Sequence, residues 1–147
     1  LMRRHNPRHR DERGSATIEA VAGAAAFAAF CSLAYLGGHI ALAHQSVQVA
    51  AAEAARSASI ARTQPAAAQA ATAAAQQVLA NHQLACVSSH VSVDTSGFTV
   101  PVGQPAWVTV TVGCEIDSRA MGVPIGIGSL WVEETLRSPL DTYRLRS

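Results

Sequence analysis

The stretch with the clearest chemical meaning lies near the start of the chain, at residues 13–19 (RGSATIE). The small residues Gly14 and Ser15 directly follow a basic stretch. One carboxylate, Glu19, then stands at the start of a long apolar segment. Cleavage after Gly14 would give Ser15 a cationic α-amino group able to pair with Glu19. An acidic side chain inside a membrane-length segment is costly and usually functional. The alternative is a carboxylate placed favourably at the positive end of a helix dipole.

Cys86 and Cys114 are the second pair of residues whose types point to chemistry. Valines alternate with polar residues on both sides of a turn-forming stretch, which predicts an antiparallel hairpin. We expect Cys86 to face Cys114 in that hairpin. In the same register Val91 lies opposite Thr109, and directly opposed residues are close enough for a disulfide. Two buried free thiols are the alternative.

Catalytic chemistry finds little support in the sequence. It contains no nucleophile elbow, phosphate-binding loop or metal motif. The cysteines lack Cys-x-x-Cys spacing, and His82 and His90 are scattered. Glu133 and Glu134 are adjacent on an expected strand and therefore point to opposite faces. We expect no enzyme activity, no metal and no cofactor.

The charge pattern argues against a nucleic-acid-binding protein. The formal net charge is +1, and all 11 basic residues are arginines, five of which precede Gly14. Basic charge therefore belongs to the start of the chain and not to a patch on a folded surface. Charged residues make up only 14% of the chain, which also argues against a disordered protein.

The elements that must position these residues begin with a basic leader and a membrane helix. Residues 1–14 read as a cytoplasmic leader, because arginine excess beside a membrane span stays inside. Residues 15–43 are expected to form a transmembrane helix, since no full charge follows Glu19 until Glu53 and a span needs about 20 apolar residues. The rest of the chain would then lie outside the cell membrane.

A secretory signal is the alternative interpretation of the same segment. Ala41-Leu42-Ala43 would serve a signal peptidase and release a soluble domain beginning at His44. Against this stand the carboxylate of Glu19 at the head of the apolar segment and a span longer than a typical signal.

Residues 44–84 are expected to form extracytoplasmic helices with a break at Thr63-Gln64-Pro65, where proline can open the next helix. The second helix is rich in alanine and has a polar and an apolar side. The polar side comprises Gln69, Thr72, Gln76 and Gln83; the apolar side comprises Ala67, Ala71, Ala74 and Val78.

Residues 85–147 are expected to form a small antiparallel β domain. A third strand at Leu130 to Leu136 completes a meander after a connector from Gly122 to Gly128. The predicted fold class is therefore α+β, with a long N-terminal helix, a second helix and a small sheet closed by a disulfide. Disulfides persist on the outer side of the membrane.

The stretch 13–19 resembles the processing site of type IV pilin-like proteins. Together with the span, the alanine-rich helix, the two-cysteine β segment and the ending 141–144 (DTYR), it resembles the TadE-like pseudopilins of the tight-adherence (Tad/Flp) pilus system, actinobacterial type. The resemblance implies a pilin-like fold and cleavage by a prepilin peptidase between Gly14 and Ser15. It also implies that Glu19 neutralises the N-terminus of a neighbouring subunit. The chain departs from many members in having Ala20 after the glutamate and no proline in the span.

The expected function is that of a minor pilin-like protein in the assembly of a Tad/Flp-type pilus or a related secretion fibre. The expected partners are a prepilin peptidase, other pilin or pseudopilin subunits through the N-terminal helix, and the membrane, but no nucleic acid. The alternative is a single-pass anchored or secreted extracytoplasmic binding module without a role in a pilus.

Overall fold

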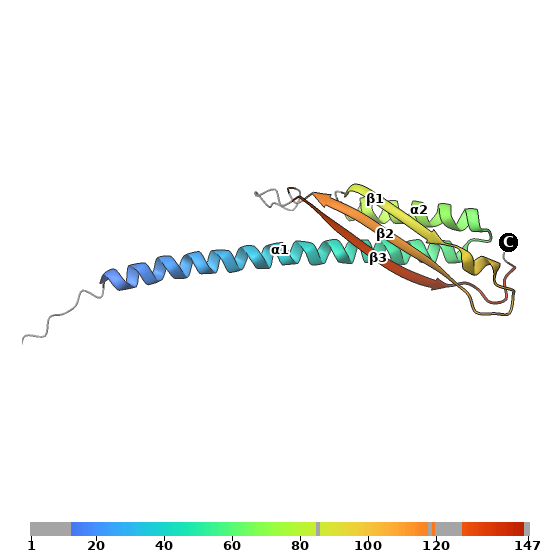
Figure 1. The fold of residues 1–147 in the computed structure, drawn as a ribbon, viewed down its shortest axis with the longest axis horizontal. Helices are drawn as coiled ribbons and strands as arrows, with labels where there is room; N and C mark the ends of the chain where they lie inside the picture. Colours follow the sequence, from blue (N-terminus) through green and yellow to red (C-terminus); the bar gives the residue numbers. More distant parts are fainter. Residues whose placement is uncertain (1–12, 85, 118, 120–127, 146–147) are drawn as a thin grey trace, which may run out of the picture. The chain divides into compact units, whose positions relative to one another are not determined.

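The structure, a computed structural model, describes residues 13–84, 86–117, 119 and 128–145, with side chains from residue 17 on. In chain order the elements are helices α1 (Arg13–Ile60) and α2 (Gln64–Asn81), strand β1 (Cys86–Asp94), the short 3-10 helix η1 (Ser96–Thr99), and strands β2 (Trp107–Asp117) and β3 (Ser129–Pro139) (Figure 1). The predicted α+β class is confirmed.

The chain divides into two compact units at the Gly37-Gly38 pair, and α1 contributes to both. In the first unit, Leu1–Gly37, every described residue belongs to α1. The predicted leader falls almost entirely on residues 1–12, which lie outside the described residues. The predicted connector from Gly122 to Gly128 also lies outside them, except for Gly128.

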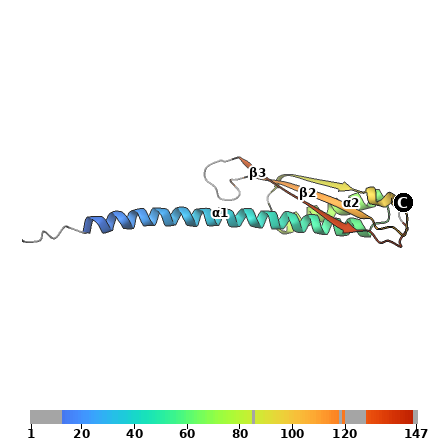
Figure 2. The ribbon, with the colours of Figure 1, turned by 60° about the horizontal axis from the view of Figure 1, so that its bottom comes forward.

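The second unit, Gly38–Ser147, is built on a three-stranded antiparallel sheet in the order β1-β2-β3. The α1 residues of this unit and α2 both lie against one face of the sheet, as two views of the ribbon show (Figures 1 and 2). The central strand β2 alternates with a period of two, as strands with one covered face do. Its buried side chains are Val108, Val110, Val112, Cys114 and Ile116.

Alanine supplies the helical side of this core. Fully buried alanines of α1 and α2 form one cluster with the valines of β2 and with Val132 of β3. The α1 members are Ala43, Ala50, Ala51, Ala54, Ala55 and Ala58, with Val47 among them. Alanine forms helix readily and leaves little bulk between a helix and its neighbours, so a core with few aromatic residues can still be densely packed.

Helix α2 begins where the sequence predicts a break. The side-chain oxygen of Thr63 accepts a hydrogen bond from the backbone N–H of Ala66, and Pro65 stands in the first turn. The buried stripe differs in part from the prediction, because Ala75 and Leu79 are buried where Ala74 and Val78 were expected. The stripe follows a strict four-residue spacing, which is the ridge that helices most often use in packing.

The predicted register of the hairpin is wrong by three residues. Val91 pairs with Val112 instead of Thr109, and Val93 pairs with Val110. Directly paired residues of an antiparallel sheet point to the same face. The observed register therefore puts the valines of both strands on the covered face, whereas the predicted one would have paired valine with a surface-facing threonine.

A β-bulge at the start of β1 reconciles this register with the cysteines. The register steps between Cys86 and Ser88, so that these two residues pair with the adjacent Ile116 and Glu115. The step turns Cys86 to the covered face. Cys114 lies on that same face, two residues along β2 from Ile116, the partner of Cys86. Bulges commonly re-aim a side chain in this way, and Val87 inside the bulge is exposed.

The alanine core leads to a first prediction. Ala54→Leu should destabilise the folded chain by about 1–3 kcal/mol, because Ala54 is fully buried in a packed cluster and the added carbons must displace their neighbours. Ala52→Leu, two residues away and exposed, is the matched control and should change stability by less than about 0.5 kcal/mol. Urea unfolding of the detergent-solubilised chain, followed by tryptophan fluorescence, measures both; equal effects of the two variants would contradict this packing.

Candidate functional site

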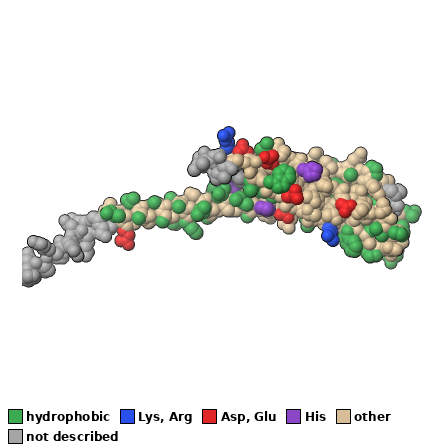
Figure 3. Space-filling view, viewed as in Figure 1, with side chains coloured by type: hydrophobic (Ala, Val, Ile, Leu, Met, Phe, Trp, Pro, Cys, Tyr) green, Lys and Arg blue, Asp and Glu red, His purple; other side chains and the backbone are tan. Residues whose placement is uncertain are grey.

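The N-terminal part of α1 carries the residues that the sequence singles out for assembly. From Thr17 to Tyr35 every side chain is exposed, and bulky apolar groups such as Phe27 (70% exposed) and Phe30 (68%) face outward. Figure 3 shows hydrophobic side chains along this part of the helix. Among the described residues, α1 is the one helix long and apolar enough to cross a membrane. A helix that is apolar on all sides needs lipid or other helices around it.

Glu19 is exposed on this helix and is the only residue with a full charge between Thr17 and Ala52. Ser15 and Glu19 are four residues apart on α1 and therefore share one face. In the uncut chain Glu19 lies in the second turn of the helix, because α1 begins at Arg13. A helix dipole acts mainly within the first turn, so it gives little reason for a carboxylate at this position.

The peptide bond between Gly14 and Ser15 lies in the first turn of α1. The first four N–H groups of a helix have no partner within it, and helix ends fray. A peptidase that needs an extended substrate would therefore have to unwind only this turn. Cleavage here would make Ser15 the first residue of the helix and bring the new amino group within one turn of Glu19.

The predicted disulfide is present in the second unit. Cys86 and Cys114 are bonded, with their Cα atoms 5.4 Å apart, which is an ordinary spacing for a disulfide. Cys114 is fully buried among the core residues, and the bond joins the edge strand β1 to the central strand β2. The remaining cysteine, Cys31, is free and exposed on α1.

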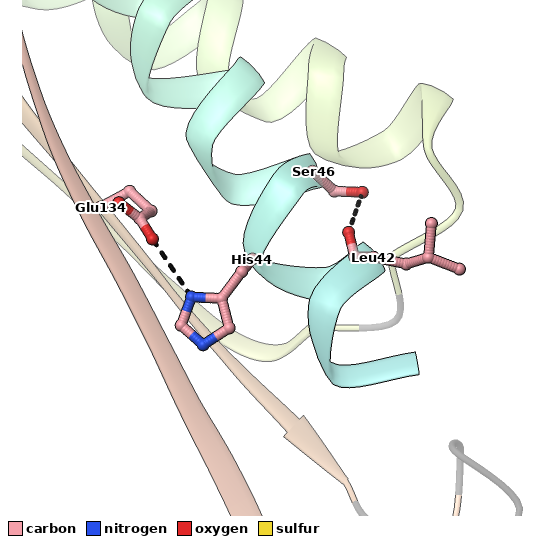
Figure 4. Close-up of polar contacts among 4 residues, drawn as sticks. All are labelled: Leu42, His44, Ser46 and Glu134. Carbon is pink, nitrogen blue, oxygen red and sulfur yellow. Dashed lines mark hydrogen bonds and ion pairs between the residues drawn. The ribbon is translucent and has the colours of Figure 1, made fainter. Parts of the chain in front are cut away.

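Two histidines tie α1 to its neighbours in the second unit, and the sequence analysis missed both contacts. Nδ1 of His44 lies 3.1 Å from Oε1 of Glu134 on β3, and Figure 4 shows the two side chains pointing toward each other. The hydroxyl of Ser46 donates to the carbonyl of Leu42 and lies 3.4 Å from Nδ1 of His82, the residue that caps α2. These contacts fix α1 against β3 and the end of α2.

The adjacent glutamates of β3 point to opposite faces, as the strand period predicts. Glu134 meets α1, whereas Glu133 accepts a hydrogen bond from the indole N–H of Trp131 on the other face. On that outer face Glu115 accepts hydrogen bonds from the hydroxyls of Ser129 (2.5 Å) and Ser88 (2.8 Å). These two bonds hold the pKa of Glu115 below its ordinary value, so the carboxylate is ionised at neutral pH.

The described residues provide little that resembles a catalytic pocket. Within them, no group of three or more His, Cys, Asp or Glu side chains could hold a metal ion. An open depression on α2 is lined by alanines and by the amide and hydroxyl groups of Gln69, Thr72 and Gln76. Neutral groups of this kind can form hydrogen bonds but have no pKa near neutrality with which to exchange protons.

Comparisons with known proteins leave the chain without an assigned relative. No family model matches it, and neither a curated protein nor a solved structure matches it. The resemblance to TadE-like proteins therefore depends on the residues of the sequence alone.

The disulfide leads to a second prediction. Replacing both bonded cysteines with alanine should lower the free energy of unfolding by about 3–4 kcal/mol, because the bond closes a loop with a sequence separation of 28 residues. Cys31→Ala is the matched control and should change it by less than about 0.5 kcal/mol, since that thiol is exposed. Chemical unfolding with and without reductant measures the difference, and a wild-type chain insensitive to reductant would contradict the bond's contribution.

Proposed function

We propose that this chain is a minor pilin-like (TadE-like) protein that is cut between Gly14 and Ser15 by a prepilin peptidase. It acts in the assembly of a Tad/Flp-type pilus or a related secretion fibre. Its N-terminal helix packs against the corresponding helices of other pilin or pseudopilin subunits. The protein works through this packing and not through catalysis.

One observation carries the proposal. The α1 residues of the first unit expose bulky apolar side chains on all sides and carry a single carboxylate, Glu19, four residues after Ser15. Lipid alone would cover the apolar surface but would leave the carboxylate without a cationic partner at the edge of the hydrocarbon core. A cationic N-terminus on a neighbouring helix would supply that partner. The carboxylate therefore favours assembly over simple anchoring.

The proposed orientation places the basic leader in the cytoplasm and the sheet outside the membrane. Five arginines precede Gly14, and basic residues beside a span are retained on the cytoplasmic side. The disulfide supports the same direction, because such bonds persist in oxidising compartments. In this arrangement the folded second unit would be carried at the cell surface or along a fibre.

A second candidate function is a single-pass anchored or secreted extracytoplasmic binding module. The observation in its favour is a half-exposed tryptophan, Trp131, on the outer face of the sheet. If the module were secreted, release at Ala43 would begin the mature chain with His44. The core residue Ala43 would then be lost from α1, together with the backbone carbonyl of Leu42 that accepts the hydroxyl of Ser46.

The assembly role leads to a third prediction. Glu19→Ala should reduce incorporation of the protein into sheared surface fibres, or cross-linking to pilin subunits, by roughly tenfold or more, because an unpaired N-terminus would remain in the apolar bundle. Glu53→Ala removes an exposed carboxylate of the second unit on the same helix and is the matched control. Membrane insertion of both variants should equal wild type.

These variants separate the two candidate functions. Normal fibre incorporation by the Glu19→Ala variant would contradict the pilin proposal and leave the binding module. Equal loss in the Glu19→Ala and Glu53→Ala variants would point to a general folding defect, which near-ultraviolet circular dichroism of the purified variants would reveal.

A further inference from the structure

The outer face of the sheet, opposite the helices, presents a tryptophan in an ordered setting. On this face Trp131 of β3 pairs with Glu115 of β2, and the next pair along the two strands joins Glu133 to Gly113. These four residues form the corners of a square on the sheet surface, which we call the Trp131 square. Figure 3 shows hydrophobic, acidic and histidine side chains close together over the sheet.

The indole of Trp131 lies diagonally across this square. A Cβ atom at Gly113 would stand 2.3 Å from Cζ2 of Trp131, so the six-membered ring fills the place that a side chain at position 113 would need. An aromatic ring over a cross-strand glycine is a recognised stabilising arrangement in sheets. The indole N–H donates to Oε2 of Glu133 at 3.2 Å, which fixes the orientation of the ring. Even so, Trp131 remains 48% exposed.

Because the ring runs from one corner to the opposite one, the two remaining corners flank it, and both carry carboxylates. Glu115 and Glu133 are diagonal neighbours, which places their Cα atoms about 7–8 Å apart with the ring between them. Glu115 is held in place by the hydroxyls of Ser88 and Ser129. A fixed aromatic surface is thus bordered by negative charge on two sides.

The charges around the square identify the kind of ligand that it suits. Among the described residues on this face, the rows around the ring carry the carboxylates of Glu115 and Glu133, and the next row adds that of Asp117, which pairs with Ser129. The imidazole of His90 lies in the row of Gly113. Of the described arginines, Arg119 follows two residues after Asp117, and Arg137 lies six residues along β3, about 20 Å away. The quadrupole of an indole attracts cations, and carboxylates do so more strongly. The square is therefore complementary to a positive group.

We propose that the Trp131 square binds an arginine side chain presented by a partner protein. The planar guanidinium would lie on the exposed indole surface and donate to the carboxylates of Glu115 and Glu133 on either side. Arginine fits better than lysine because its planar group stacks on an aromatic ring and donates in two directions at once. The site lies in the second unit and does not depend on the proposed pilus role.

A single such contact is weak, so the expected affinity for one arginine is in the millimolar range. Several arginines in one flexible segment rebind the same site and raise the apparent affinity. A fluorescein-labelled hexa-arginine peptide is therefore a suitable probe. The full-length chain in non-ionic polyoxyethylene micelles is titrated with it, and the anisotropy of the peptide is measured at low and at physiological salt.

The fourth prediction concerns this titration. Hexa-arginine should bind saturably and more tightly than hexa-lysine. Trp131→Ala and the double variant Glu115→Gln/Glu133→Gln should each weaken binding by about tenfold. Matched controls are Trp107→Ala, which removes the other exposed tryptophan, and Glu53→Gln, which removes an exposed carboxylate elsewhere. Each control should change the dissociation constant by less than about twofold.

A second measurement detects binding in the wild-type chain, so that its result does not depend on the folding of any variant. In the wild-type chain, the indole Nε1–H resonance of Trp131 should shift on addition of hexa-arginine while that of Trp107 stays in place; the Trp107→Ala variant assigns the two signals. Equal weakening by the controls would overturn the proposal, because binding would then reflect general charge attraction. Saturable binding of maltohexaose in place of hexa-arginine would also overturn it and identify a carbohydrate surface instead.

Discussion

The structure depends on how one long helix has its apolar surface covered. In the second unit, small alanines of α1 pack against the valine face of β2 and β3. Helix α2 completes the core with apolar side chains at every fourth position. In the first unit the same helix exposes bulky apolar side chains. Apolar surface of this extent is not stable in water. This exposed apolar surface is the basis of the proposal that a membrane and neighbouring helices surround the first unit.

Much of the fold follows from local patterns in the sequence. The alternation of valine with threonine predicts β2, the Thr63-Gln64-Pro65 stretch predicts the start of α2, and two late cysteines predict the disulfide. The register was missed because the sequence reasoning placed Cys86 directly opposite Cys114. In the structure the valines of β1 pair with the valines of β2, and a bulge at Val87 brings Cys86 close enough to Cys114 for the disulfide. The choice between pairing the cysteines directly and pairing the valines depends on the packing of the whole covered face. Local spacing in the sequence does not determine that packing.

The candidate sites differ in how far they could be foreseen. Glu19 stands out in the sequence because a charge inside a long apolar segment is unusual, and its place on an exposed helix face is consistent with that reading. The Trp131 square could not be foreseen, because it requires knowing that Gly113 and Trp131 are diagonal neighbours on adjacent strands. The contact of His44 with Glu134 likewise joins residues 90 positions apart. Long-range pairs of this kind appear only once the register and the helix packing are known.

The central claim is that α1 enters an assembly as the N-terminal helix of a processed subunit. The most direct test is the intact mass and N-terminal sequence of the protein isolated from the membrane or fibre fraction of its own host. The account predicts a mature chain that begins Ser15-Ala16-Thr17, with a mass that rises by two hydrogens on reduction of the disulfide. A chain that begins at His44 would contradict the claim and identify a secreted domain. A chain that keeps the leader would leave Glu19 without its proposed partner and contradict the claim as well.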